Sequence, residues 1–159
     1  MSATRVLYVG MDVDKEKIAV AALGATGRDT ISEQMIRNDI PAIKKYFGRL
    51  NDEQTQIHAC YEAGFCGFEL ARRLEEVGVR CSVAAPGMLP KKPADRVKTD
   101  RRDALTLAKA LRNCDIHEVN VPTRDDEAVR DYLRMYEQVK VDLKRAKQRA
   151  VHFLHGRGA

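Results

Sequence analysis

Three short apolar runs occupy the first 37 residues. They cover residues 5–11, 17–24 and about 28–37, and each contains β-branched or aromatic apolar side chains. Runs of this length and composition predict β-strands. Because short polar links join them, consecutive strands are expected to pair in antiparallel fashion. The start of the chain therefore predicts a three-stranded antiparallel meander.

The pattern then changes from strands to a helix. Asn38 or Asp39 can cap this helix, and Pro41 lies in its first turn, where proline is tolerated because that turn lacks internal N–H partners. Apolar side chains recur at helical spacing and form one face: Ile43, Tyr46, Phe47 and Leu50. An amphipathic helix is predicted to pack this face on the sheet.

Strands and helices alternate over the next part of the chain. A strand at 56–61 ends on Glu62, an amphipathic helix is expected over about 65–77, and another buried strand is expected at 79–85. Strand–helix–strand units require parallel pairing with a right-handed crossover. We therefore expect these strands to extend the meander into a mixed sheet.

Two further elements complete this first region. After a proline-containing basic loop at 86–99, residues 100–113 are apolar at helical spacing. An edge strand is expected around 117–121, and Pro122 and Thr123 then separate this region from a different element.

Residues 125–155 carry a heptad repeat. One core position is occupied by Val129, Tyr136, Leu143 and Ala150, and the other by Tyr132, Val139, Ala146 and Phe153. Nearly four unbroken heptads favour a coiled coil that self-associates as a dimer or tetramer. The alternative is a single helix packed back on the first region.

Positive charge is concentrated in two segments of a chain whose net charge is +5. Residues 91–102 carry six basic and two acidic side chains, and residues 140–149 carry five basic and one acidic side chain. Such clusters suit phosphate backbones, although a solvated helix face is the simpler explanation for the second segment alone. The candidate nucleic-acid-binding residues are Lys91, Lys92, Arg96, Lys98, Arg101, Arg102, Lys140, Lys144, Arg145, Lys147 and Arg149.

The cysteines and the apolar runs indicate a cytoplasmic protein. Cys60, Cys66, Cys81 and Cys114 show no C-x-x-C spacing and fall in apolar surroundings, so they are expected to be reduced core residues. The longest apolar run, IAVAALGA, is too short to span a membrane. We expect no membrane partner.

Two aspartates three residues apart begin the helix at 100–113. Asp100 and Asp103, in KTDRRDALTLAKAL, lie one helical turn apart and face the same side. They can act as helix-capping acids, with Asp100 at the N-cap. They can also be ligands of a divalent metal ion, which would offset their mutual repulsion. The second interpretation requires further carboxylates nearby.

The predicted strand order supplies those carboxylates. A meander followed by helix, strand, helix and strand is the layout of a ribonuclease H-like α/β fold, with a mixed five-stranded sheet and flanking helices. In it the first and fourth strands are neighbours, so Asp12 and Glu62 would meet at one rim, beside Asp100 and Asp103. Two Mg²⁺ or Mn²⁺ ions would balance four carboxylates and assist phosphoryl transfer.

The motifs GMDVDK, YEAG and KTDRRDA resemble the ordered D, E, D and D motifs of the DEDD transposases of insertion-sequence family 110. The resemblance covers nearly the whole chain. It implies an N-terminal domain similar to RuvC resolvases, over residues 1–122, with Asp12, Glu62, Asp100 and Asp103 as catalytic metal ligands. Residues 123–159 would be the coiled-coil helix.

The resemblance also implies properties of a longer protein. Members of the family join a C-terminal domain with a serine nucleophile to this region, and a structured guide RNA directs them to DNA. The chain ends before such a domain, so we expect a fragment or truncated product that is incomplete as a recombinase of DNA.

Two alternatives remain. A DEDD exonuclease has two acids separated by one residue in its first motif, which Asp12 and Asp14 imitate. A non-catalytic module that binds nucleic acid and dimerises would use the same carboxylates structurally. Digestion of free ends would favour the first, and metal-independent stability the second.

Overall fold

The computed structural model describes residues 5–26, 30–52, 54–64, 66–87 and 100–158. By its internal contacts the chain divides into two units, Met1–Val121 and Pro122–Ala159.

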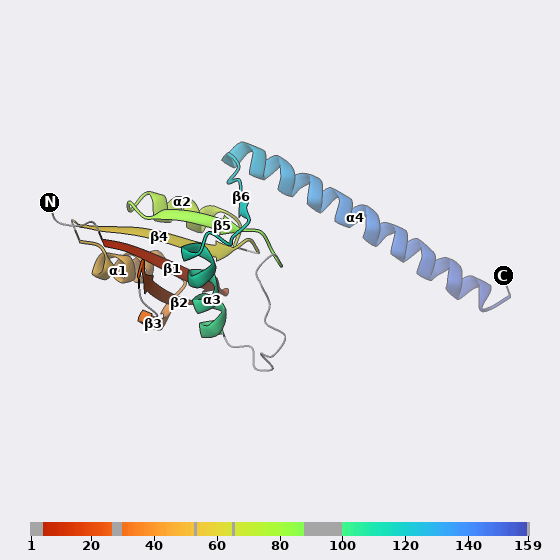
Figure 1. Cartoon of the computed structure of the whole chain (residues 1–159). Coiled ribbons are helices and arrows are strands. Elements are labelled where there is room, and N and C mark those ends of the chain that lie inside the picture. Colours follow the sequence, from red (N-terminus) through yellow and green to blue (C-terminus); the bar gives the residue numbers. More distant parts are fainter. Residues whose placement is uncertain (1–4, 27–29, 53, 65, 88–99, 159) are drawn as a thin grey trace. The chain divides into compact units, whose positions relative to one another are not determined.

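The first unit contains one mixed sheet (Figure 1). Its strands, in chain order, are β1 (Arg5–Val13), β2 (Lys17–Gly24), β3 (Thr30–Arg37), β4 (Thr55–Glu62), β5 (Arg80–Ala84) and β6 (Glu118–Val119). They lie in the order β3-β2-β1-β4-β5-β6. The β1–β2, β2–β3 and β5–β6 pairs are antiparallel, whereas β1–β4 and β4–β5 are parallel. The predicted meander and crossovers are confirmed. The edge strand expected around 117–121 is present as β6, but it has only two residues.

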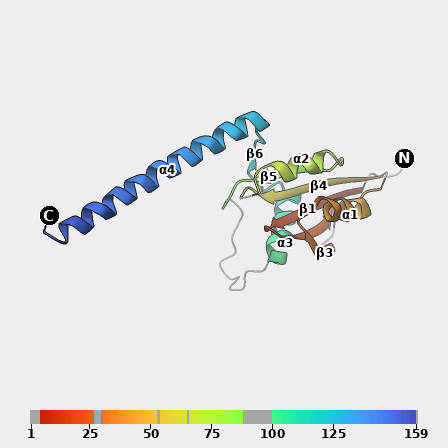
Figure 2. The same cartoon turned by 180° about the vertical axis from the view of Figure 1, so that it is seen from behind.

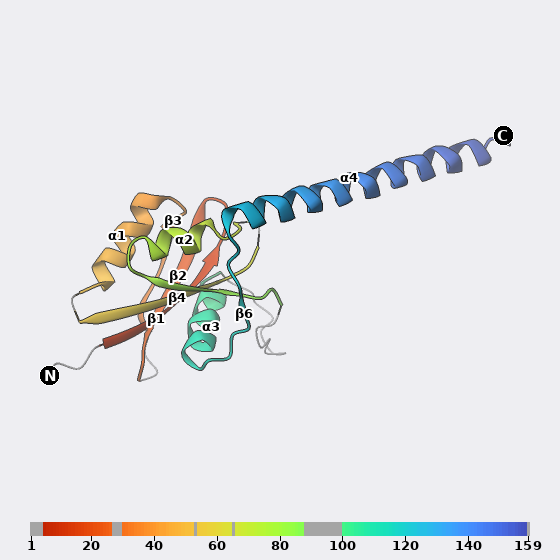
Figure 3. The ribbon, with the colours of Figure 1, turned by 90° about the horizontal axis from the view of Figure 1, so that it is seen from above.

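Helices cover both faces of the sheet. The core on one face joins the sheet to α1 (Ile40–Leu50) and α2 (Glu69–Glu75), and α3 (Asp100–Arg112) packs on the other face through Ala104, Leu107 and Leu111. Figure 2 and Figure 3 show α1 and α2 on one side of the sheet and α3 on the other. This three-layer arrangement is the ribonuclease H-like α/β fold.

Local chemistry sets the bounds of α1 and α2. Asp39 caps α1, because its carboxylate accepts a hydrogen bond of 2.8 Å from the amide of Ala42. The α2 helix begins later than the expected residue 65. Gly67 has a φ of 57°, a left-handed conformation that a right-handed helix excludes. The helix therefore starts only after this turn.

The second unit consists mainly of α4 (Arg124–His155), as the heptad pattern predicted. Thr123 caps it, since the threonine hydroxyl accepts a hydrogen bond of 3.1 Å from the amide of Asp126. None of its side chains is buried. The large apolar residues of the predicted seam are at least half exposed, as for Tyr136 at 51% and Phe153 at 61%. The helix is confirmed, and a coiled-coil partner stays a prediction. Within the described residues, no helix combines the length and apolarity needed to cross a membrane.

All four cysteines are free thiols, but only some belong to the core. Cys60 and Cys81 are buried, and Cys66 packs partly buried against the core. Burial raises the pKa of Cys60 to about 12, so this thiol is unreactive at neutral pH. The expectation was wrong for Cys114, which is exposed and has a φ of 60° in the turn after α3. Its position beyond the helix end removes it from the buried stripe.

Candidate functional site

Two of the predicted acids lie on adjacent strands at one rim of the sheet. β1 and β4 pair in parallel, and the last residues in register are Met11 and Tyr61. Asp12 and Glu62 are the next residue on each strand, so the two backbones carry them side by side. The sequence placed Asp12 just after the strand, whereas β1 continues through it to Val13.

Both acids face α3. Side chains two residues apart on a strand share a face, so Asp12 lies on the face of Gly10 and Glu62 on that of Cys60. The thiol of Cys60 donates a hydrogen bond of 3.4 Å to the carbonyl oxygen of Leu107 in α3. The α3 helix therefore packs on the same face that carries the two carboxylates.

Gly10 allows α3 to approach the sheet closely. A Cβ atom at this position would lie far inside van der Waals contact with the carbonyl oxygen of Ala104 and the amide nitrogen of Ala108. Only glycine removes that overlap. Because Gly10 precedes Asp12 by two residues and Ala104 follows Asp103, this contact brings the two acid-bearing segments together.

The first turn of α3 lies at the same rim. The Nζ atom of Lys17 is 3.3 Å from Oδ2 of Asp100. Lys17 begins β2, directly before Ile18, which pairs with Val13 at the end of β1. Asp100 therefore lies where β1 ends, and Asp103 follows one helical turn later. The backbone places all four predicted acids at one rim and on one face.

The side chains of these acids have their own partners. The amide of Gly87 donates a hydrogen bond of 2.7 Å to Oε1 of Glu62, and Asp100 pairs with Lys17. Among the described residues, no three His, Cys, Asp or Glu side chains are close enough together to hold a metal ion. The backbone and the hard oxygen donors fit a divalent cation, but Glu62 and Asp100 must first exchange their present partners.

The predicted nucleic-acid-binding residues divide into three groups. Lys91, Lys92, Arg96 and Lys98 lie outside the described residues. Arg101 and Arg102 are exposed in the first turn of α3. The other five are exposed on α4: Lys140, Lys144, Arg145, Lys147 and Arg149.

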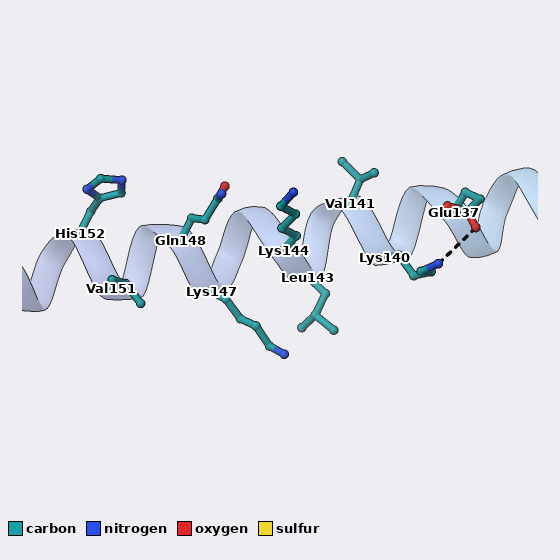
Figure 4. A pocket seen from close by; sticks show the side chains of 9 residues that line it. All are labelled: Glu137, Lys140, Val141, Leu143, Lys144, Lys147, Gln148, Val151 and His152. Atoms are coloured by element: carbon teal, nitrogen blue, oxygen red, sulfur yellow. Dashed lines mark hydrogen bonds and ion pairs between the residues drawn. The ribbon is translucent and has the colours of Figure 1, made fainter.

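On α4, acids offset part of this positive charge. Lys140 pairs with Glu137 at 3.3 Å, and Arg145 pairs with Asp142 at 3.8 Å. The dashed line in Figure 4 marks the first of these pairs. Within the described part of the chain, Lys144, Lys147 and Arg149 make no ion pair. No described acid offsets the charges of these three side chains, so they can bind an external anion.

Sequence reasoning missed two residues of this rim. Gly10 carried a signal, because a glycine inside a strand pattern often marks a close backbone approach. Lys17 carried none, since its partner Asp100 is 83 positions away.

Comparisons with known proteins place the chain in a family. Residues 9–157 match a family model described as "Transposase", that of the IS110-type DEDD transposases. The chain is 44% identical over 151 residues to the transposase for insertion sequence element IS1533 of Leptospira borgpetersenii, which covers 94% of this chain and 44% of that protein. It is 38% identical over 157 residues to the putative transposase y4qE of Sinorhizobium fredii, with 96% and 40% coverage. The chain therefore spans less than half the length of these relatives, and it belongs to the IS110-type DEDD transposase family.

Proposed function

We propose that Asp12, Glu62, Asp100 and Asp103 form the divalent-metal site of a transposase that acts on DNA phosphodiesters. The observation that carries this proposal is their common position at one rim and on one face of the sheet. Four carboxylates held together without cations would repel one another. A pair of Mg²⁺ or Mn²⁺ ions matches their formal charge.

The four acids divide into two pairs in this proposal. Asp12 and Glu62, on paired central strands, form the rigid half of the site, because both strands are held by hydrogen bonds on either side. Asp100 and Asp103 close it from α3. Bound Mg²⁺ or Mn²⁺ would supply Lewis-acid chemistry at a phosphodiester.

The remaining parts of the chain would hold the substrate and its partners. Residues 1–122 form the RuvC-like domain, and residues 123–159 form the start of a coiled-coil linker to a C-terminal domain with the serine nucleophile. Exposed Arg101 and Arg102 beside the acids, and the basic side chains of α4, would bind DNA and a structured guide RNA through their phosphates. Backbone contacts carry no sequence information, so pairing with the RNA would supply specificity.

Metal binding tests this function directly. Saturating Mg²⁺ or Mn²⁺ is expected to raise the melting temperature of the chain by about 5–10 °C, the shift that a ligand at roughly 100 times its Kd gives a domain of this size. Asp12→Asn and Asp103→Asn should each abolish the rise in differential scanning fluorimetry.

Two matched variants sharpen the result. Asp115→Asn changes an exposed acid after the far end of α3 and should keep the rise. Asp14→Asn changes the exposed acid that follows β1 and should keep it too, whereas an exonuclease-like D-x-D motif would require Asp14. If neither Mg²⁺ nor Mn²⁺ changes the melting temperature of the wild-type chain, the non-catalytic binding module is favoured.

A further inference from the structure

Lys17 and Asp100 join two elements that are distant in sequence. Lys17 is the first residue of β2 and Asp100 the first of α3, and their charged atoms are 3.3 Å apart. The side chains are 52% and 54% exposed. The pair is therefore open to solvent and to ions.

The lysine ammonium contacts the oxygen atom that a cation would need. An ammonium group is a compact point charge with three N–H donors, and here it lies against Oδ2 of Asp100. A divalent ion at the same oxygen would bring two cationic centres into contact. One of them must leave, because like charges at this separation repel.

We propose that Lys17 is the built-in counter-ion of the metal-free rim, and that a divalent cation displaces it from Asp100. This inference rests on the proposed metal site. Without metal, Lys17 offsets the repulsion between Asp100 and Asp103, which lie one turn apart in the first turn of α3. With metal, that role passes to the ion, so Lys17 lowers the affinity of the site for cations.

Lys15 offers a comparison with Lys17. Lys15 is exposed in the turn between β1 and β2, two residues before Lys17. Its ammonium makes no ion pair with another described residue. Arg101 follows Asp100 directly, but successive residues on a helix point about 100° apart. Lys15 therefore provides a control that changes the same charge at the same rim without the contact.

The effect should be small and measurable. Exposed ion pairs contribute modestly to stability, and loss of this competition should tighten metal binding about two- to fivefold at low ionic strength. Higher ionic strength should reduce this difference in metal affinity, because salt screens both the Lys17–Asp100 pair and the attraction of the metal to the acids.

Titration of the full chain with Mn²⁺, followed by the electron paramagnetic resonance signal of free Mn²⁺, tests the proposal. Lys17→Gln should bind Mn²⁺ two- to fivefold more tightly than Lys15→Gln, and Lys17→Arg should keep the wild-type Kd. Lys17→Ala repeats the charge removal with a different side chain, and circular dichroism checks that each variant is folded.

The outcomes separate this inference from the proposed function. If the wild-type chain binds no Mn²⁺ at the rim, the metal site and the counter-ion role both fail. If the wild type binds and Lys17→Gln binds equally to Lys15→Gln or more weakly, only the counter-ion role is overturned. Weaker binding would mean that Lys17 orients Asp100 for the metal instead of competing with it.

Discussion

Gly10 shows how one residue controls the geometry of the candidate site. Its missing side chain lets α3 cross β1 at backbone contact, with Ala104 and Ala108 directly above. The distance between β1 and α3 sets how closely Asp12 and Asp103 approach each other. A larger residue would move the helix, and the acids with it.

A substitution at Gly10 should therefore destabilise the fold. Gly10→Ala is expected to lower the free energy of unfolding by about 1–3 kcal/mol, because rigid backbone atoms of α3 must shift to accept the methyl group. Gly48→Ala in α1 is the matched control, since beyond its own helical backbone and chain neighbours no described atom lies within 4 Å of the added Cβ. This variant should raise the free energy of unfolding by about 0.5–1 kcal/mol. Urea denaturation measures both. Equal stabilities of the two variants would contradict the close approach.

At the scale of elements, α4 is a helix whose apolar residues lack a partner within their own unit. Tyr136 and Leu143 belong to the predicted seam, and both are more than half exposed. Val141 is also an exposed apolar residue, but Figure 4 shows Val141 and Leu143 pointing to opposite sides of the helix. The two sides can therefore be tested separately.

Self-association of α4 should depend on the seam alone. Tyr136→Glu together with Leu143→Glu is expected to dissociate the oligomer, because charges in a coiled-coil core lose their water. Val141→Glu should leave it intact. Sedimentation velocity reports the oligomeric state of each. A wild-type chain that sediments as a monomer would favour the alternative of a single helix packed on its own first unit.

At the scale of the whole molecule, the excess positive charge is local. The two basic segments together carry +8 against a net charge of +5, so the rest of the chain carries −3. Lys144, Lys147 and Arg149 contribute charge that no described acid offsets. Affinity for nucleic acid should then come from these side chains and not from charge spread over the surface.

Salt dependence distinguishes a local site from general attraction. Replacing Lys144, Lys147 and Arg149 by Gln is expected to reduce the slope of log K against log salt by about 2–3 for duplex DNA, roughly 0.9 for each lost phosphate contact. The control replaces Lys44, Lys45 and Arg49, which are exposed on α1, and should leave the slope unchanged. Fluorescence anisotropy at several salt concentrations measures it. Equal slopes for both triple variants would refute a binding surface on α4.

The sequence by itself determined most elements and their order. Hydrophobic periodicity placed β2 at its observed bounds and the long helix to within one residue, from 125–155 to Arg124–His155. It also identified Asp100 and Asp103 as candidates through their spacing, and Asp12 and Glu62 through the expected order of the strands. These features depend on residues a few positions apart, so local patterns contain them.

Tertiary structure alone decided how these parts meet. It delayed the start of α2 through the conformation of Gly67. It also placed Asp12 inside β1 and exposed Cys114. It also paired Lys17 with Asp100 and gave Glu62 the amide of Gly87 as a partner. Such contacts join residues up to 83 positions apart. They form only after the sheet and α3 have packed, because the free energy of that packing, and not any local preference, brings the two ends of each contact together.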